Sequence, residues 1–447
     1  MRLILYRLLY GFLIFLSAIS VLLAELLDDI NLLFIGTVII SISISFYVYF
    51  CKGGFKNHWL YFYTLFFIFF IIGPLLSLLL YGNIYQPFLI RTTFANGVSI
   101  AAINATISYM YYFLLIQALL IPLSKSPRMV LKPNPELTRF SFRILSLLLV
   151  LLITYKLINF EFVGYTQIYV AKGDMIESLL SSFTYAGFLL FLASVARKSE
   201  FKIIVLLYIA VLLFDVVLGY RGGILIFMLT SLWYYSIAYR FSPSKLQIYT
   251  LVLFIVVFLF VIEAVRSDQL AGISLFVPFV LGSLSKGIYT TSLYLDHSMM
   301  IDERFSYTIF GPLSFTYQYL FYGSEIVGNN PMSADIRQDL NHVMSSTINY
   351  SAYLNGAGLG SSFLPELIQL GKGLFLLFAL LFFFLYEYLL RYAFRYRVLL
   401  PFAVFTFQHF IFISRDSYFP FFWGYIKLSI LLLIIYCVYW GYRKIKI

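Results

Sequence analysis

The sequence is short of charge. Only 11% of its 447 residues are Asp, Glu, Lys or Arg, whereas 62% are apolar and 20% are aromatic. Soluble domains carry about 25% charged and about 45–50% apolar residues, so this chain has too few charges to cover a water-exposed surface. The composition excludes a soluble domain, a disordered chain, a coiled coil and a disulfide scaffold. It predicts a multi-pass membrane protein.

Cysteines and specific catalytic motifs are also scarce. The two cysteines, Cys51 and Cys437, lie at the end of one apolar run and inside another, which argues against a disulfide framework or a cysteine-based zinc site. The sequence contains no HExxH, no Walker-type glycine-rich loop, no GxSxG and no Asp-x-Asp pair in a loop. We therefore expect neither a bound metal nor a cofactor.

Long apolar runs dominate what is present. A membrane-spanning helix needs about 20 mostly apolar residues. Twelve runs fit this length approximately, and they predict an all-α polytopic membrane protein. Their approximate ranges are 3–24, 31–51, 58–81, 98–123, 141–160, 179–196, 203–219, 223–239, 247–265, 364–390, 398–413 and 419–440.

The basic residues predict the orientation, because short cytoplasmic loops of membrane proteins are rich in Lys and Arg. With a cytoplasmic N-terminus, the inside segments hold twenty of the 31 basic residues and only two acids, Glu136 and Glu200. Both termini are then cytoplasmic, and topology accounts for the net charge of +11 without a nucleic-acid partner. The alternative is a cytoplasmic basic patch that binds a partner. Eleven basic residues lie elsewhere: Arg91, Lys156, Lys172, Arg221, Arg266, Lys286, Arg304, Arg337, Lys372, Arg415 and Lys427.

One long polar segment divides the chain. We predict nine spans in residues 1–265, a large outer loop at 266–362 and three spans in 363–447. A structureless loop of that length is uncommon in a compact protein, so the loop should be folded and functional. Its stretch 273–295 is apolar enough for a helix in the membrane plane or a re-entrant helix. A thirteenth span there is the alternative, but it would turn the basic cluster Arg391–Arg397 outward.

Three arginines stand at predicted outer turns: Arg221 in LGYRGG, Arg266 in EAVRSD and Arg415 in ISRDSYFP. A guanidinium stays charged and matches phosphate oxygens bidentately, so arginines at similar depth can bind a di-anion such as pyrophosphate. The alternative is that each arginine contacts lipid headgroups or pairs with a neighbouring acid. Glu263, Asp268 and Asp416 are close enough in the sequence for that pairing.

The end of the large loop, from Arg337 to Gly373, is polar and rich in glycine. Polar residues at the mouth of a span often mark a pathway or a site. Asn, Tyr and His can donate to and accept from sugar hydroxyls, and His342 is the best candidate for moving a proton near neutral pH. The simpler interpretation of a single loop histidine is a solvated or structural residue.

These features together resemble a family. Twelve spans with cytoplasmic ends, the segment LGYRGGILIF, a large late loop ending in NGAGLGSSFLPELIQLGKGLF, and the turn ISRDSYFPFF resemble the Wzy-type oligosaccharide repeat-unit polymerases of O-antigen and capsule pathways. The resemblance implies a membrane glycosyltransferase of the GT-C type in the bacterial inner membrane. It would join undecaprenyl-pyrophosphate-linked repeat units on the periplasmic face. A Wzz-type chain-length regulator is an implied partner beside the lipid bilayer.

The resemblance also implies roles for individual residues. Arginines would hold the pyrophosphate, and pyrophosphate is a good enough leaving group that no metal is needed. His342 or a nearby carboxylate would take the proton of the acceptor hydroxyl. The predicted catalytic residues are His342, Asp339 and Asp416. The predicted pyrophosphate ligands are Arg221, Arg266, Arg337 and Arg415, and the predicted sugar ligands are Tyr220, Asn341, Tyr350 and Asn355.

Two other functions fit this architecture. An O-antigen ligase differs only in its acceptor, and the sequence does not separate it from a polymerase. A flippase or secondary transporter would also have about twelve spans, but it should carry charges at the membrane midplane and repeat symmetry between its halves. The predicted midplane of this chain is nearly uncharged, and its halves are unlike.

Overall fold

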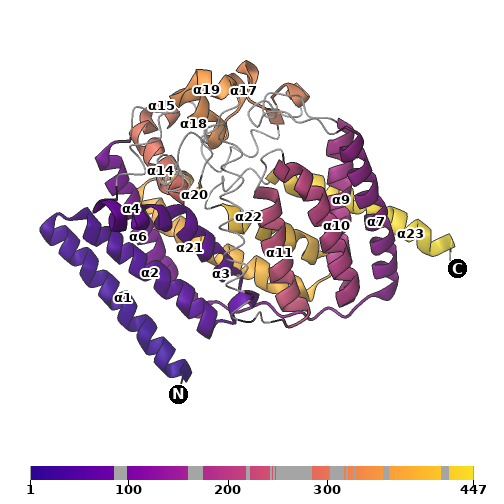
Figure 1. Cartoon of the computed structure of the whole chain (residues 1–447), viewed down its shortest axis with the longest axis horizontal. Coiled ribbons are helices and arrows are strands. Elements are labelled where there is room, and N and C mark those ends of the chain that lie inside the picture. Colours follow the sequence, from indigo (N-terminus) through magenta and orange to yellow (C-terminus); the bar gives the residue numbers. More distant parts are fainter. Residues whose placement is uncertain are drawn as a thin grey trace. The chain divides into compact units, whose positions relative to one another are not determined.

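The structure is a computed structural model of the whole chain, and it is helical (Figure 1). It describes residues 2–84, 98–159, 175–217, 222–241, 284–302, 321–326, 328–355, 362–413 and 422–445, together with 244, 247, 317 and 318. No strand occurs among these residues, and eight of the described helices are long and apolar enough to cross a membrane. The predicted class, an all-α polytopic membrane protein, is confirmed.

The chain forms two compact units, each built from separated stretches of sequence. Unit 1 comprises Met1–Ser126, Gln269–Tyr388 and His409–Pro420, and unit 2 comprises Pro127–Asp268, Leu389–Gln408 and Phe421–Ile447. The division of the chain predicted at residues 265 and 362 stays a prediction, since the residues around 265 lie outside the described ranges.

Unit 1 holds the N-terminal helices and the helices of the large loop. Its long helices are α1 (Arg2–Leu27), α2 (Ile30–Cys51), α3 (His58–Phe66), α4 (Gly73–Tyr81), α6 (Ile100–Leu120) and most of α21 (Lys372–Tyr392). The loop adds α14 (Lys286–Asp296), α15 (Ser298–Asp302), α17 (Pro331–Ile336), α18 (Leu340–Ile348), α19 (Tyr350–Leu354) and α20 (Phe363–Gln369). Short turns are η1 (Gly54–Lys56), η2 (Phe67–Ile72), η3 (Ile121–Leu123) and η4 (Gly323–Ile326).

Unit 2 holds the middle helices and the C-terminal helix. They are α7 (Pro135–Ile158), α9 (Met175–Ser194), α10 (Lys198–Val217), α11 (Gly222–Ala238), η5 (Ala393–Arg395), most of α22 (Leu399–Phe412) and α23 (Phe422–Ile445). The helices α11 and α22 have only 17 and 14 residues, short of a full span by themselves. The predicted run 247–265 lies almost wholly outside the described residues.

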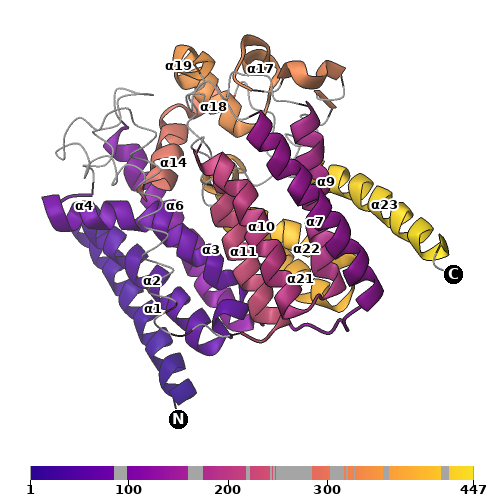
Figure 2. The same cartoon turned by 45° about the vertical axis from the view of Figure 1, so that its right-hand side comes forward.

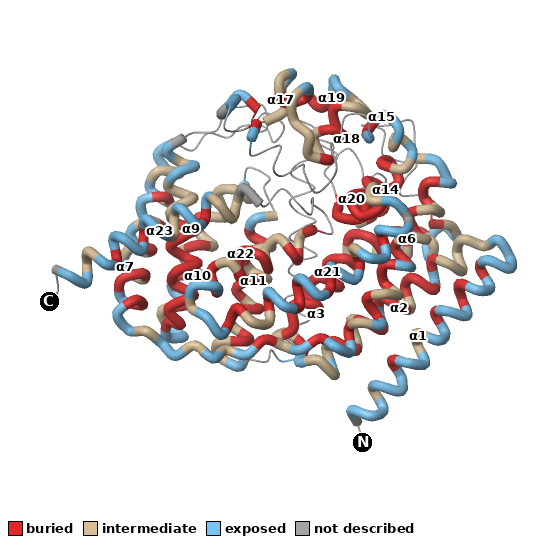
Figure 3. Tube along the Cα trace, turned by 180° about the vertical axis from the view of Figure 1, so that it is seen from behind, coloured by how far each residue is buried: buried red, intermediate tan, exposed pale blue. Residues whose placement is uncertain are grey.

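Helix α1 packs against α2 as an antiparallel pair, turned by Asp28 and Asp29. Asp28 adopts a positive φ of 49°, and the Asp29 side chain accepts the Asn31 backbone N–H and so caps α2. Only 22% of the residues in the most apolar 18-residue stretch of α1 are buried. The exposed positions of this helix are mainly Leu, Ile and Phe (Figure 3). An apolar surface of this extent needs lipid to cover it.

The predicted run 58–81 is one continuous rod with a π-helical turn in its middle. The turn η2 interrupts the α-helical hydrogen bonding between α3 and α4, and such turns arise where one extra residue is accommodated in a helix. Helix α14 packs against this turn. Its Gly287 has no side chain to fill the contact, and a Cβ built there would lie 2.5 Å from the Phe70 ring.

The predicted run 364–390 is not one helix. It divides into α20 and α21 at Gly371, which adopts a left-handed φ of 86°. Glycine adopts this conformation without steric cost, and it commonly ends helices in this way. The break turns α20 back into unit 1, where it packs against α14 and α6. Residues 363–368 are therefore buried in protein.

Basic segments gather at one end of each unit, called here its basic end. In unit 1, Lys52 donates through its Nζ to the carbonyls of Pro122 and Ser124, joining segments 70 residues apart. In unit 2, Arg397 donates to the Lys132 carbonyl over 2.6 Å. The Tyr239 hydroxyl binds the Ala196 carbonyl over 2.8 Å at the same end. The inside segments predicted from Lys and Arg within each unit thus lie together.

The close approach of α14 to the π-helical turn makes Gly287 sensitive to a larger side chain. Gly287→Ala should lower the free energy of unfolding by about 1–3 kcal/mol through overpacking against Phe70, measured as a lower melting temperature of the protein in detergent. Gly11→Ala is the control, since a Cβ there meets nothing within 4 Å. Equal melting of both variants would mean that the contact is not tight.

Candidate functional site

Three short helices at the end of the large loop carry most of the described candidate residues. Each begins at a residue in the extended conformation: Asn330 before α17, Asp339 before α18 and Asn349 before α19. Asn330 and Asn349 accept backbone N–H groups with their side chains, which stabilises α17 and α19 despite their lengths of only six and five residues. In unit 1 they lie beyond the ends of α14 and α6, away from the basic end (Figure 2).

Asp339 does not cap the helix that it precedes. Its Oδ1 instead accepts a hydrogen bond of 2.7 Å from Arg337 Nε, and both side chains are mostly buried, at 15% and 12% exposure. One turn further on, His342 Nδ1 lies 2.7 Å from the Tyr353 hydroxyl of α19. The structure thus brings Arg337, Asp339, His342 and Tyr353 together, and we call them the loop cluster.

The charges of the loop cluster set its protonation. Burial alone would raise the pKa of Asp339, but the Arg337 guanidinium and the nearby His342 outweigh it and hold this pKa below its ordinary value. Burial lowers the pKa of His342 to about 4, partly offset by Asp339. Burial also raises the pKa of the Tyr353 hydroxyl. At neutral pH the cluster therefore has an ionised pair, Arg337 with Asp339, beside a neutral imidazole and a neutral phenol.

The other candidate residues divide between described and undescribed parts. Asn341 lies in the first turn of α18, where its carbonyl accepts from Ser345, and Tyr350 is 45% exposed at the start of α19. Asn355 follows α19 and is exposed. Five candidates lie outside the described residues: Tyr220, Arg221, Arg266, Arg415 and Asp416.

A second acid lies in the same loop region. Asp302 ends α15, which packs against α18. Its Oδ1 accepts from the Tyr294 hydroxyl over 3.0 Å and from Gln369 Nε2 over 3.1 Å. Asp302 was not among the predicted site residues, because no sequence pattern indicates that residues 302 and 369 are in contact.

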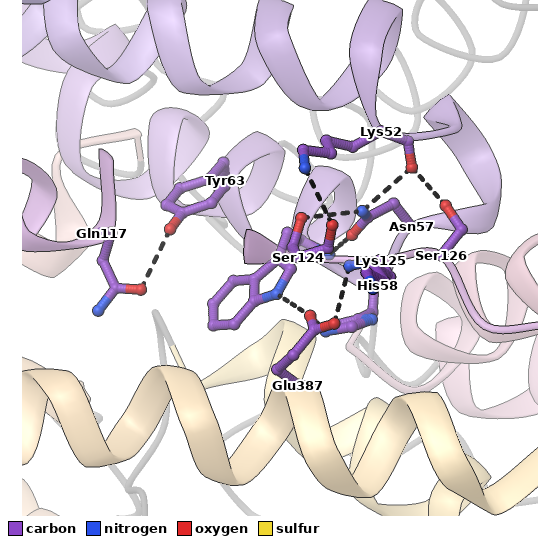
Figure 4. A network of polar contacts seen from close by, with 10 residues as sticks. Lys52, Asn57, His58, Tyr63, Gln117, Ser124, Lys125, Ser126 and Glu387 are labelled. Carbon is purple, nitrogen blue, oxygen red and sulfur yellow. Dashed lines mark hydrogen bonds and ion pairs between the residues drawn. The ribbon is translucent and has the colours of Figure 1, made fainter. Parts of the chain in front are cut away.

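A buried carboxylate, that of Glu387, lies at the basic end of unit 1 (Figure 4). Glu387 of α21 accepts from Trp59 Nε1 over 3.0 Å and from the Lys125 backbone N–H over 2.8 Å. His58 Nε2 lies 3.5 Å from the same carboxylate. Glu387 thus ties together three segments of unit 1, around residues 59, 125 and 387. The sequence signal was an acid inside an apolar run, which needs a partner.

An ion cluster stands at the end of unit 2 opposite to its basic end. The Lys156 ammonium of α7 lies 2.6 Å from Glu177 Oε1 of α9 and 2.6 Å from Asp215 Oδ1 of α10. The lysine is 10% exposed, and its two partners are 39% and 32% exposed. Lys156 is one of the eleven basic residues outside the predicted inside segments. Its contacts with Glu177 and Asp215 explain how a lysine is accommodated there.

No group of three or more His, Cys, Asp or Glu side chains that could hold a metal occurs in the part of the chain that the structure describes. The chemistry that the described loop cluster offers is hydrogen bonding and proton transfer. It also offers one guanidinium for an anion.

Comparison with known protein families identifies the chain. The family model described as O-antigen polysaccharide polymerase Wzy matches residues 6–444. The chain belongs to this family. A search of curated proteins and a search of solved structures each find no match.

The Wzy match confirms the resemblance predicted from the sequence and extends it to nearly the whole chain. The match therefore includes the N-terminal helices, which hold none of the three segments quoted for the resemblance. Together with the membrane-spanning helices, the match describes a multi-pass membrane protein of polysaccharide biosynthesis whose family activity is polymerisation.

Removing the carboxylate at the basic end of unit 1 should destabilise the protein. Glu387→Ala leaves the buried Trp59 and Lys125 N–H donors without this acceptor, at about 1–3 kcal/mol each. Glu387→Gln keeps an acceptor oxygen and should lose less. The surface change Glu136→Ala, whose carboxylate is 66% exposed, should cost under about 1 kcal/mol. Melting temperatures in detergent give the order of stability of the three variants. Equal melting temperatures of Glu387→Ala and Glu136→Ala would contradict this prediction.

The depressed pKa of His342 predicts a stability that falls in mild acid. As the pH drops below the ordinary value of 6.5, the unfolded chain takes up a proton that the folded chain, with a pKa of about 4, does not. The loss should reach about 1–2 kcal/mol between pH 7 and pH 5. Asp339 contributes only at lower pH, because its folded pKa is depressed and its unfolded pKa is about 3.9.

His342→Gln should therefore flatten the dependence of the melting temperature on pH between 7 and 5. Asn341→Ser changes the neighbouring residue without removing a titrating group and should keep the wild-type slope. An unchanged slope in His342→Gln would show that His342 is accessible to protons in the folded state.

Proposed function

We propose that the chain is a glycosyltransferase of the bacterial inner membrane. It polymerises undecaprenyl-pyrophosphate-linked oligosaccharide repeat units on the periplasmic face, and both of its termini are cytoplasmic. The proposal rests on the Wzy family match and on the bias of Lys and Arg between the loops. The observation that carries it to particular residues is the loop cluster, a neutral histidine beside a paired arginine on a polar loop.

In the proposed reaction, an acceptor hydroxyl of one lipid-linked unit attacks the anomeric carbon of the growing chain. The new carbon–oxygen bond forms as the bond to the pyrophosphate oxygen breaks, and the electron pair leaves with undecaprenyl pyrophosphate. The proton of the acceptor hydroxyl passes to His342 or to a carboxylate, Asp339 or Asp416. Transfer of this kind by a positioned base contributes about 10²–10⁴-fold to a rate.

His342 suits this role only with substrate present. Its pKa of about 4 makes the free imidazole a weak base. A pyrophosphate nearby would raise that pKa, because a negative charge favours the protonated ring. The Tyr353 hydroxyl contacts Nδ1, so Nε2 is the nitrogen left to accept a proton when Nδ1 carries the ring proton. The base would thus become effective when the anionic donor is bound.

Arginines stabilise the departing pyrophosphate in this proposal. Arg221, Arg266, Arg415 and Arg337 supply the charge, and a guanidinium aimed at a developing negative charge stabilises the transition state. Pyrophosphate leaves readily once neutralised, so the proposal requires no metal. Tyr220, Asn341, Tyr350 and Asn355 bind sugar in the proposal, and the exposure of Tyr350 suits stacking on a sugar ring.

The arginines and the histidine can be tested with one polymerisation assay. Arg221→Ala and Arg415→Ala should abolish long-chain product, and His342→Ala should slow polymerisation by about 10²-fold or more. The assay uses lipid-linked repeat units from cells that lack the polymerase, with chain length read as a ladder on a gel. Membrane insertion and protein amount are the controls. Normal ladders in both arginine variants would contradict the proposed pyrophosphate site.

A deletion strain separates polymerase from ligase. Cells without a polymerase should still make lipopolysaccharide that carries a single repeat unit. Cells without a ligase should make none that carries any repeat, and that result would contradict the polymerase assignment. A chain-length regulator of the Wzz type is the proposed protein partner, and its loss should change the length distribution without abolishing the polymer.

A further inference from the structure

Asp302 carries its two hydrogen bonds on a single carboxylate oxygen. Its Oδ1 accepts from the Tyr294 hydroxyl of α14 over 3.0 Å and from Gln369 Nε2 of α20 over 3.1 Å. Among the described residues no donor contacts Oδ2, and Asp302 is exposed. The carboxylate is therefore held through one oxygen, while the other oxygen is open to solvent.

The two donors hold Oδ1 from elements other than α15. Tyr294 is buried, at 2% exposure, and burial together with the negative charge of Asp302 raises the pKa of its hydroxyl, which therefore stays a donor. Gln369 ends α20, whose preceding residues are buried against α14 and α6. Asp302 is thus positioned by tertiary structure and not only by its own five-residue helix.

Asp296, one helical turn and a half earlier, shows what a structural carboxylate looks like in the same region. It is also exposed, but both of its oxygens are engaged by Ser99. Oδ2 accepts the Ser99 backbone N–H over 2.7 Å, and Oδ1 accepts the Ser99 hydroxyl. Asp296 therefore joins α14 to the start of α6 and has no oxygen left for a ligand.

The other described acids between residues 266 and 362 also differ from Asp302. Asp339 is bound by Arg337 and is 12% exposed. Glu325 and Asp335 are exposed, but their side chains form no hydrogen bond or ion pair with the described residues, so nothing fixes them. Within this described group, exposure and fixation through a single oxygen occur together at Asp302.

A fixed acceptor oxygen that faces solvent suits a hydroxyl group. A carboxylate only accepts hydrogen bonds, and bonds to a charged acceptor are about twice as strong as neutral ones. Since the side chain is already held, a ligand that binds it need not order it. The same negative charge repels a diphosphate, and one open oxygen falls far short of the about six to eight oxygen ligands that Ca²⁺ takes.

We propose that Asp302 binds a hydroxyl group of the repeat-unit saccharide through Oδ2, with Tyr294 and Gln369 as the positioning residues that hold Oδ1. This inference rests on the proposed saccharide substrate. Helix α15, which ends at Asp302, packs against α18, the helix that carries Asn341 and His342 (Figure 1). The site adds a saccharide ligand next to that helix, and it recognises the sugar and not the diphosphate.

Asp302→Asn changes the open atom from an acceptor to a donor. The asparagine oxygen can still accept from Tyr294 and Gln369, while the NH₂ group takes the place of Oδ2. Binding of the repeat-unit oligosaccharide should weaken by about 10-fold or more, because a hydrogen bond to a charged acceptor is lost. The probe is the oligosaccharide released by mild acid from the lipid-linked units of cells that lack the polymerase, so it carries no diphosphate. Saturation-transfer NMR with the full-length protein in lipid nanodiscs measures its affinity.

Asp296→Asn is the matched control. Its NH₂ group would face one of the two Ser99 donors, so it should lower the melting temperature but leave oligosaccharide binding within about 2-fold of wild type. Asp302→Asn should show the reverse pattern, with the melting temperature kept and binding weakened. Wild-type affinity in Asp302→Asn would overturn the inference, and so would an equal loss of affinity in Asp296→Asn.

Tyr294→Phe decides the matter if Asp302→Asn does not fold. It keeps the carboxylate and removes one of the two donors that hold it, so oligosaccharide binding should weaken by about 2–5-fold. Unchanged binding by Tyr294→Phe would overturn the role of a fixed carboxylate.

Farnesyl diphosphate binding and polymerisation separate this inference from the proposed function. Asp302→Asn should bind farnesyl diphosphate like wild type, and an equal loss of both ligands would overturn a site for the sugar. If the wild-type protein polymerises lipid-linked units but does not bind the free oligosaccharide, only the inference about Asp302 fails. If the wild-type protein neither polymerises these units nor binds the oligosaccharide, the proposed function fails with it.

Discussion

Hydrocarbon offers no hydrogen bonds, and the rest of this structure depends on that constraint. Every backbone N–H and C=O inside a membrane must find its partner within the protein, which leaves helices as the simplest solution for a single chain of this composition. The same constraint makes each buried charge expensive. Two of the buried charges accordingly lie near helix ends and have partners: Glu387 accepts from Trp59, and Lys156 contacts two acids.

The partnered charges also determine how the helices are held. Lipid gives no hydrophobic force between two apolar helices, so packing and hydrogen bonds must join them. Unit 1 uses aromatic packing, with Trp59 stacked 4.8 Å from Phe383 and Phe62 stacked 5.0 Å from Phe410. Glu387 then fixes the ends of these segments. Unit 2 fixes its far end through Lys156. In each unit a short polar contact secures an otherwise apolar helix assembly.

The helical class and many of the long helices could be predicted from the sequence, because the membrane sets the length of an apolar run. The breaks could not. The π-helical turn at Phe67–Ile72 occurs inside a run of uniform hydropathy. The division at Gly371 lies inside the predicted run 364–390, which was continued across it despite Gln369 and Lys372. The loop cluster was predictable as a polar segment, but the contact of His342 with Tyr353 depends on how α18 and α19 turn. The ion cluster joins Lys156 and Asp215, 59 residues apart, and no local pattern connects them.

The acids near the arginines bear on how a polymerase can release its product. Arg266, Arg337 and Arg415 each have an aspartate one or two residues later, and the described pair shows the consequence, since Arg337 binds Asp339 over 2.7 Å. An arginine with its own carboxylate neutralises a pyrophosphate only in part, and so binds the leaving group less tightly once the bond has broken. Uniformly tight binding of substrate and product would not raise turnover. Arg221 differs in its sequence context, since no acid lies within five residues of it on either side. If Arg337 contacts the diphosphate as proposed, its pairing with Asp339 would favour the charge that develops during transfer over tight retention of the released product.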